Sequence, residues 1–219
     1  MHRWVITLSL LLIGFTAQAS DIKPFEATYE LKAGGWPTAL VHHSLTAQDG
    51  VWTSTMKASV KIATGREYGR FRVADDHLQA IDFYSRYRLF GFGDDYRMNA
   101  QTLAELPDRQ TALVMMGRHV DQATCKGRNQ PPCEFVYLDH KQKPHTMDYR
   151  VIGQQAIDVP AGHWQTFHVE LWDEDKPKRL FHFYLAPQYP GLLVQVDYFK
   201  HGELDSRMQM TQFTPGTGG

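Results

Sequence analysis

The chain has 219 residues, and its 23 basic and 24 acidic side chains almost balance, which leaves a formal net charge of -1 at pH 7. Proteins that bind nucleic acid concentrate lysine and arginine to replace phosphate counterions, so this balance argues against nucleic acid and against an acidic membrane surface. The length and the hydrophobic fraction of 42% predict a single domain with a hydrophobic core.

The N-terminus has the pattern of a cleavable secretory signal peptide. Arg3 precedes an apolar run over residues 4–15, and the small residues Ala17 and Ala19 follow. We expect cleavage after Ala19, a signal peptide of residues 1–19, and export to the periplasm. An uncleaved anchor is the alternative, but the run is shorter than the roughly 20 residues that span a bilayer, so we expect no stable membrane insertion.

Alternating apolar and polar residues predict half-buried strands in the N-terminal half. These strands are expected at residues 25–31, 39–46 and 51–62. The second and third meet at Asp49-Gly50, which supplies the positive φ that a tight hairpin turn requires. Trp52 and Met56 share the apolar face of the third strand. One face of the sheet is therefore expected to pack in the core and the other to face solvent.

The alternation continues in two further strands, after which the pattern becomes ambiguous. The strands are expected at residues 68–73 and 78–89. Tyr84 and Arg86 lie on the polar face of the longer one. The structure of residues 100–133 stays open: a helical turn is expected before Pro107, and residues 112–116 fit either a short strand or a buried helix.

The only two cysteines, Cys125 and Cys133, are separated by seven polar, glycine and proline residues. In an oxidising compartment this spacing predicts a disulfide that closes a small loop. A redox-active pair would more often be Cys-x-x-Cys beside a βαβ unit, and a metal site would need further ligands nearby.

The C-terminal half again shows short alternating segments with turn signals between them. Strands are expected at residues 134–138, 146–158, 166–171, 181–185, 192–200 and 204–213. Turns are expected at Pro160-Ala161-Gly162 and at His201-Gly202, and residues 214–219 form a flexible tail. Residues 20–213 are thus predicted to be one mainly β domain. Its single antiparallel sheet curls into an open barrel, half-barrel or sandwich, with at most one or two short helices.

The chain resembles an exported bacterial family grouped as domain of unknown function 3108. The resemblance rests on residues 139–142, 147–151, 159–166, 185–187 and 192–194, and on the N-terminal start at residues 25–29. It spans nearly the whole mature chain and departs from the family at the cysteine loop and at residues 84–99. It implies a periplasmic antiparallel β domain akin to the open barrels of envelope lipid and lipoprotein carriers.

Catalytic and metal-binding patterns are weak. The histidine pairs considered are His42-His43, His140 with His145, and His163 with His168. A separation of about one helical turn aligns two ligands only on a helix, whereas these segments are predicted to be strands or turns. There is no Gly-x-Ser-x-Gly elbow, phosphate-binding glycine loop or dinucleotide fingerprint. We therefore expect no metal and no cofactor, and an enzyme is the least favoured class.

Two candidate binding surfaces remain. Aromatic and guanidinium groups gather at Tyr84, Arg86, Arg88, Phe90, Phe92, Tyr96 and Arg97. Such groups suit sugars, anionic head groups or a peptide edge, although cross-strand Arg–Tyr pairs on a solvent-exposed face are the favoured explanation. A curled sheet can also enclose an apolar groove lined by residues such as Trp52 and Met56, unless these simply form the core.

These patterns favour a non-catalytic binding or carrier module for an apolar or amphipathic envelope molecule, such as a lipid or glycolipid. The alternative is an envelope accessory protein that docks on another protein through a strand edge or through residues 84–97. An open, connected groove would favour the first function, and a filled interior with a flat unpaired edge would favour the second. The sequence leaves the oligomeric state undetermined.

Overall fold

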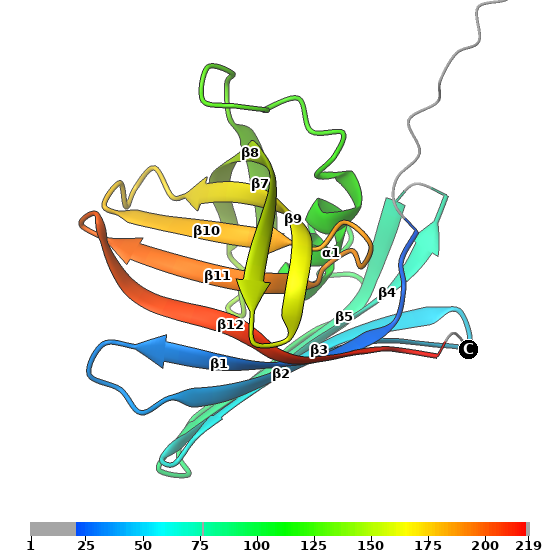
Figure 1. Ribbon diagram of the computed structural model, residues 1–219. Coiled ribbons are helices and arrows are strands. Elements are labelled where there is room, and N and C mark those ends of the chain that lie inside the picture. Colours follow the sequence, from blue (N-terminus) through cyan, green and yellow to red (C-terminus); the bar gives the residue numbers. More distant parts are fainter. Residues whose placement is uncertain (1–20, 76, 218–219) are drawn as a thin grey trace, which may run out of the picture.

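The computed structural model describes residues 21–75 and 77–217, so the predicted signal peptide and its cleavage site lie outside the described residues. The described residues form twelve strands and one α-helix (Figure 1). The strands are β1 (Phe25–Ala33), β2 (Ala39–Gln48), β3 (Val51–Val60), β4 (Ala63–Ala74), β5 (His77–Leu89), β6 (Asp95–Met98), β7 (Cys133–Leu138), β8 (Pro144–Val159), β9 (Gly162–Trp172), β10 (Arg179–Leu185), β11 (Leu193–Lys200) and β12 (Glu203–Pro215), and the helix is α1 (Arg109–His119). The mainly β prediction with a short helix is confirmed.

All strands belong to one antiparallel sheet with the order β6-β5-β4-β3-β2-β1-β12-β11-β10-β9-β8-β7. Each half is a meander of sequential neighbours, and the pairing of β1 with β12 joins the halves. The sheet curls without closing, because β6 and β7 are its two ends. This confirms the predicted open, curled sheet.

Local turn chemistry explains the meander. Asp49 and Gly50 have φ values of 50° and 73°, and His201 and Gly202 have 55° and 84°. Both pairs therefore adopt the positive φ that two-residue hairpins require, which confirms the predicted turns. The expected third strand at residues 51–62 is too long by two residues, because the chain reverses after Val60.

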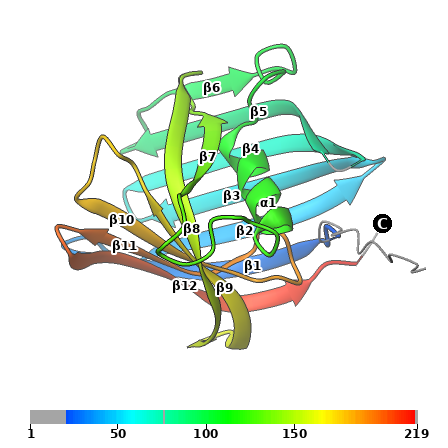
Figure 2. The same cartoon turned by 90° about the horizontal axis from the view of Figure 1, so that it is seen from above.

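The helix α1 lies across the concave side of the curled sheet, over β3 and β4, with β7 and β8 beside it (Figure 2). Val114 packs in a core cluster with residues of β1, β2 and β12, whereas Leu113 and Met116 pack in a second cluster with residues of β8 and β9. The helix thus fills the space between the two halves of the sheet. No helix among the described residues is long and apolar enough to cross a membrane.

Asp108 fixes the start of the helix. Its buried carboxylate accepts hydrogen bonds from the backbone N–H of Gln110 at 2.9 Å and of Thr111 at 3.1 Å. This is the geometry of an N-cap. A Cβ on Gly69 of β4 would lie 2.3 Å from the Asp108 Oδ1 atom, so only glycine lets the cap approach the sheet this closely. Residues 112–116, left open between strand and helix, are therefore helical.

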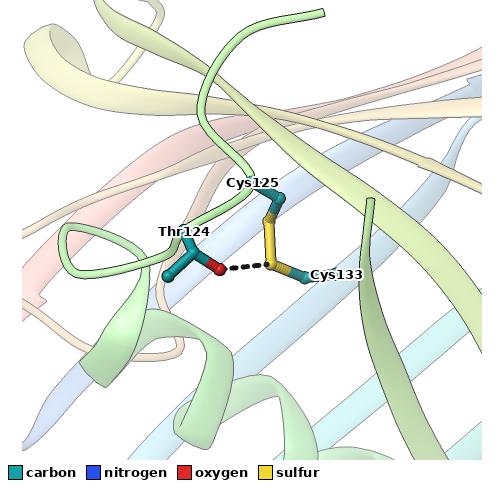
Figure 3. Close-up of a disulfide and its surroundings, with 3 residues drawn as sticks. All are labelled: Thr124, Cys125 and Cys133. Carbon is teal, nitrogen blue, oxygen red and sulfur yellow. Dashed lines mark hydrogen bonds between the residues drawn. A yellow bond between two sulfur atoms is a disulfide. The ribbon is translucent and has the colours of Figure 1, made fainter. Parts of the chain in front are cut away.

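Cys125 and Cys133 form a disulfide, as predicted, with a Cα–Cα distance of 5.6 Å (Figure 3). The Thr124 hydroxyl lies 3.9 Å from the Cys133 sulfur. The loop is also anchored to β8, because the Val151 N–H donates to the Cys125 carbonyl at 3.1 Å and the Gly127 N–H donates to the Val151 carbonyl at 2.9 Å. The crosslinked loop thus continues the sheet edge beyond β7.

The last strand is longer than the sequence pattern suggests. It includes Thr214 and Pro215, and Pro215 pairs with Phe25 of β1. The Gly216 N–H donates to the Pro24 carbonyl at 2.9 Å. The first residues assigned to the flexible tail are therefore paired with the start of the domain.

Candidate functional site

An apolar pocket of about 440 Å³ opens on the concave side of β3, β4 and β5. Its floor is formed by two rows of residues that are paired across the three strands. One row consists of Ala58, Gly65 and Tyr87, and the other consists of Val60, Ala63 and Leu89. The small side chains at positions 58, 63 and 65 leave room above β3 and β4. The larger side chains of β5 form a wall beside that room.

The β5–β6 connection forms the other wall. Phe92, Asp94 and Tyr96 line the pocket from this side. Gly93 has a φ of 152°, and a Cβ there would lie 1.9 Å from the Tyr87 carbonyl oxygen. The connection can therefore fold closely over the end of β5 only with glycine at this position.

Large apolar side chains are exposed where the end of β5 meets the β5–β6 connection; Leu89 and Phe92 line the pocket there, and Phe90 lies between them in the chain. Phe92 is 83% exposed, Phe90 67% and Leu89 50%. Backbone hydrogen bonds nevertheless hold this segment in place. The Leu89 N–H donates to the Phe92 carbonyl at 2.7 Å, and the Phe90 N–H donates to the Ile62 carbonyl at 2.8 Å. Clustered apolar exposure on an ordered surface marks an interaction site.

A polar network joins Tyr87, which lines the pocket, to the helix α1. The Arg109 Nε donates to Glu67 Oε2 at 2.8 Å, and its Nη2 donates to both Glu67 and the Tyr87 hydroxyl. Gln110 also donates to Glu67 and accepts from the Ser54 hydroxyl at 2.8 Å. The network links the first turn of α1 to β3, β4 and β5. Glu67 and Arg109 form an ion pair within this network, so their opposite charges compensate each other.

The predicted site residues divide between the two faces of the sheet. Tyr84, Arg86, Arg88 and Arg97 gather round Asp95 of β6. Asp95 accepts from the Tyr84 hydroxyl at 2.9 Å and pairs with Arg88, while its Oδ1 lies 3.8 Å from the Arg86 Nε. The Arg97 guanidinium lies 4.7 Å from the centre of the Tyr84 ring. Hydrogen bonds from Tyr84 and Arg88 hold the pKa of Asp95 below its usual value.

The remaining predicted residues lie on the concave face. Tyr96 lines the pocket, and its ring centre is 4.7 Å from that of His140. Trp52 and Met56 instead pack against the two large core clusters. The structure therefore brings Tyr96 to the pocket and Arg88 to its margin, and it places Trp52 and Met56 in the core packing.

The pocket floor was missed at the sequence level. Val60, Ala63 and Leu89 face one another only after the register of three strands is set. The one local signal was the sequence Leu89-Phe90-Gly91-Phe92, in which large apolar residues occupy a glycine turn rather than a strand interior.

Possible metal ligands occur elsewhere. Within the described residues, His168, Glu170 and His182 offer ligand atoms that all lie within 4.8 Å of one another. They belong to β9 and β10, which are not among the strands that form the pocket.

Comparisons with known proteins give only distant likenesses. No family model and no curated protein sequence matches the chain. Among solved structures, the Pseudomonas aeruginosa MucA/MucB complex aligns at 14% identity over 90% of this chain and 53% of that chain, with a TM-score of 0.41. A crystal structure of MucB aligns at 14% identity over 90% of this chain and 55% of that chain, with a TM-score of 0.40. The chain spans about half the length of these proteins, and a likeness this weak carries no argument about function.

Proposed function

We propose that this chain is a non-catalytic binding module that holds an apolar or amphipathic envelope molecule in the pocket between β3, β4, β5 and the β5–β6 connection. The observation that carries the proposal is an open apolar pocket lined by the exposed side chains of Leu89 and Phe92, with the exposed Phe90 between them in the chain. Leaving such side chains in water forfeits about 1.5–3 kcal/mol each relative to burial, which a bound apolar molecule would recover in part.

The size and polarity of the pocket support an amphipathic ligand. A volume of about 440 Å³ falls within the range of small-molecule sites. The floor is apolar, whereas Arg88 and Asp94 lie among the lining residues. An apolar tail would thus contact Val60, Ala63 and Leu89, and a polar head would remain near Asp94, since Arg88 is already paired with Asp95.

The disulfide supports a periplasmic location. Disulfides persist in oxidising compartments and are rare in the cytosol. Together with the predicted signal peptide, the Cys125–Cys133 crosslink fits a protein exported to the periplasm. Membership of the family named domain of unknown function 3108 is part of the same proposal, and it rests on the sequence resemblance alone.

Docking on an envelope protein is the second candidate function. The strand β6 is the outermost strand of its half of the sheet, so it offers an edge for strand addition. The charged groups of residues 84–97 favour this function less, because Arg86, Arg88 and Arg97 already contact Asp95 or Tyr84.

Native mass spectrometry of protein purified gently from the periplasm tests the proposal. We expect a co-purifying lipid or glycolipid, and we expect Ala63→Trp to reduce its occupancy because the indole fills the pocket. Ala156→Trp is the matched control, since Ala156 is an exposed strand residue of β8 that does not line the pocket.

The outcomes separate the two candidate functions. Loss of the bound molecule in Ala63→Trp but not in Ala156→Trp supports the binding module. Protein that is empty in its parent form, or equally occupied in both variants, contradicts it and shifts the assignment to protein docking.

A further inference from the structure

The strands β9 and β10 carry a compact group of metal-ligating side chains on the face opposite to the core. His168 and Glu170 are two residues apart on β9, so both point to the same face, whereas Val169 between them is fully buried in the core. His182 of β10 pairs directly with Glu170 in the strand register. Two neighbouring strands thus bring two imidazoles and a carboxylate together.

The spacing of the three ligand atoms is close to that of a metal site. All three lie within 4.8 Å of one another, and His182 Nε2 is 3.9 Å from Glu170 Oε1. A tetrahedral zinc ion with bonds of about 2.0–2.1 Å requires separations of about 3.3 Å between its ligands. Small side-chain rotations would close the difference without moving the strands.

Two of these atoms lack the partners that buried polar atoms normally have. The Nε2 atoms of His168 and His182 are buried and form no hydrogen bond. A buried polar atom without a partner destabilises the folded state, because it has lost its hydrogen bonds to water. A cation bound between the imidazoles and Glu170 would accept both lone pairs and remove this cost.

Aromatic neighbours hold both imidazoles in place. The His168 ring stacks on Tyr184 with centres 4.9 Å apart, and the His182 ring lies 4.8 Å from the centre of Phe199. Burial lowers the pKa of both histidines, although the neighbouring carboxylates of Glu170 and Asp197 act in the opposite direction. The neutral imidazole is the form that binds metals.

Two charged side chains, Arg128 and Asp197, lie near the Glu170 carboxylate. Arg128, from the disulfide-closed loop, donates to Glu170 Oε1 at 2.7 Å, but its side chain is 71% exposed. The oxygen that faces His182 is thus the one that Arg128 contacts, so a bound cation would share Oε1 with Arg128 or take the second oxygen of the carboxylate. The nearby Asp197 is already paired with Arg207 through hydrogen bonds of 2.6 and 2.9 Å.

We infer that His168, Glu170 and His182 form a binding site for a divalent transition metal, with zinc as the best match. Two imidazoles and one carboxylate form a ligand set typical of zinc, whereas magnesium and calcium prefer oxygen ligands alone. Three protein ligands leave the fourth tetrahedral position to a water molecule. Arg128 weakens the site, because its positive charge repels the cation and occupies Glu170.

Isothermal titration of untagged protein with Zn²⁺ alone tests this inference. We expect one zinc ion per chain, and we expect His168→Phe and His182→Phe each to weaken binding by at least about 100-fold, since even groups behind the ligands commonly contribute 10–100-fold. Phenylalanine preserves the ring contacts with Tyr184 and Phe199, so the fold should persist, and thermal unfolding of each variant checks this.

Two further variants sharpen the result. His163→Phe is the matched control, because His163 also lies beside a carboxylate, at 2.9 Å from Asp158, but belongs to no group of three ligands within residues 21–75 and 77–217. It should bind zinc like the parent. Arg128→Gln should tighten binding by up to about tenfold at low ionic strength, because it removes a positive charge close to the cation.

The opposite results would overturn the inference. Absence of zinc binding, or zinc binding that folded His168→Phe and His182→Phe proteins retain, would show that these residues do not form the site. Weaker binding by Arg128→Gln would contradict the role of Arg128. Substitution of Co²⁺ gives a second readout, since a tetrahedral site produces visible absorption bands that both phenylalanine variants should lose.

Discussion

Acidification should destabilise the protein through His43, which is fully buried in β2. Its Nε2 lies 3.1 Å from the Ser54 hydroxyl, which in turn donates to Gln110 of α1 at 2.8 Å. Burial lowers the pKa of His43 from 6.5 to about 3. The ring is therefore neutral in the folded state. The free energy of unfolding is highest above pH 6.5 and decreases as the pH falls from 6.5 toward 3.

The size of the effect follows from proton linkage. Below pH 6.5 the unfolded chain gains a proton at this histidine that the folded chain does not bind, which costs about 1.4 kcal/mol per pH unit. At pH 5 the loss is about 2 kcal/mol relative to pH 7, a large part of the 5–15 kcal/mol that stabilises a typical domain.

Urea unfolding of the parent and of His43→Gln, each at pH 7 and pH 5, isolates this residue. The change in the free energy of unfolding between pH 7 and pH 5 is compared within each protein, so the pH-independent effect of the substitution cancels. All other titrating groups are the same in both proteins. We expect the parent to lose about 2 kcal/mol more than the variant on acidification. Equal losses in both proteins would refute the assignment of a buried, neutral His43.

Two other predictions concern the disulfide and the N-cap of α1. Replacing Cys125 and Cys133 with alanine should lower the free energy of unfolding by about 2.5 kcal/mol in non-reducing urea titrations, because the unfolded chain loses a short crosslinked loop, and dithiothreitol should abolish the difference. Gly69→Ala should displace the Asp108 cap and α1, and reduce far-UV helical signal and stability together. An unchanged melting temperature in Gly69→Ala would contradict the close approach of Asp108 to β4.

Most strands were predictable because their information is local. Alternation of apolar and polar residues identifies β1, β2 and β5 to within a few residues, and Asp49-Gly50 marks a hairpin by its backbone preference alone. The strand β6 was missed, because four residues carry too little alternation to be distinguished from a loop. The family resemblance stays a prediction.

The helix shows the limit of periodicity. It contacts both halves of the sheet, so buried residues occur all round it and no apolar stripe appears. Gln110 and Thr111 are buried although polar, because Ser54, Glu67 and Asp108 satisfy their hydrogen bonds. Asp108 is a neighbour in the chain, but Ser54 and Glu67 are distant in the sequence, so the pattern around residue 110 alone could not identify them.

The sequence by itself determined the β-rich class, the hairpin turns and the disulfide, because backbone preference, side-chain alternation and short loop closure act between near neighbours. The tertiary structure alone decided which residues share a site. The pocket needs the register of β3, β4 and β5, and the cluster of His168, Glu170 and His182 needs the register of β9 with β10. Registers depend on packing across the whole curled sheet, and a shift of one residue would send each of these side chains to the opposite face.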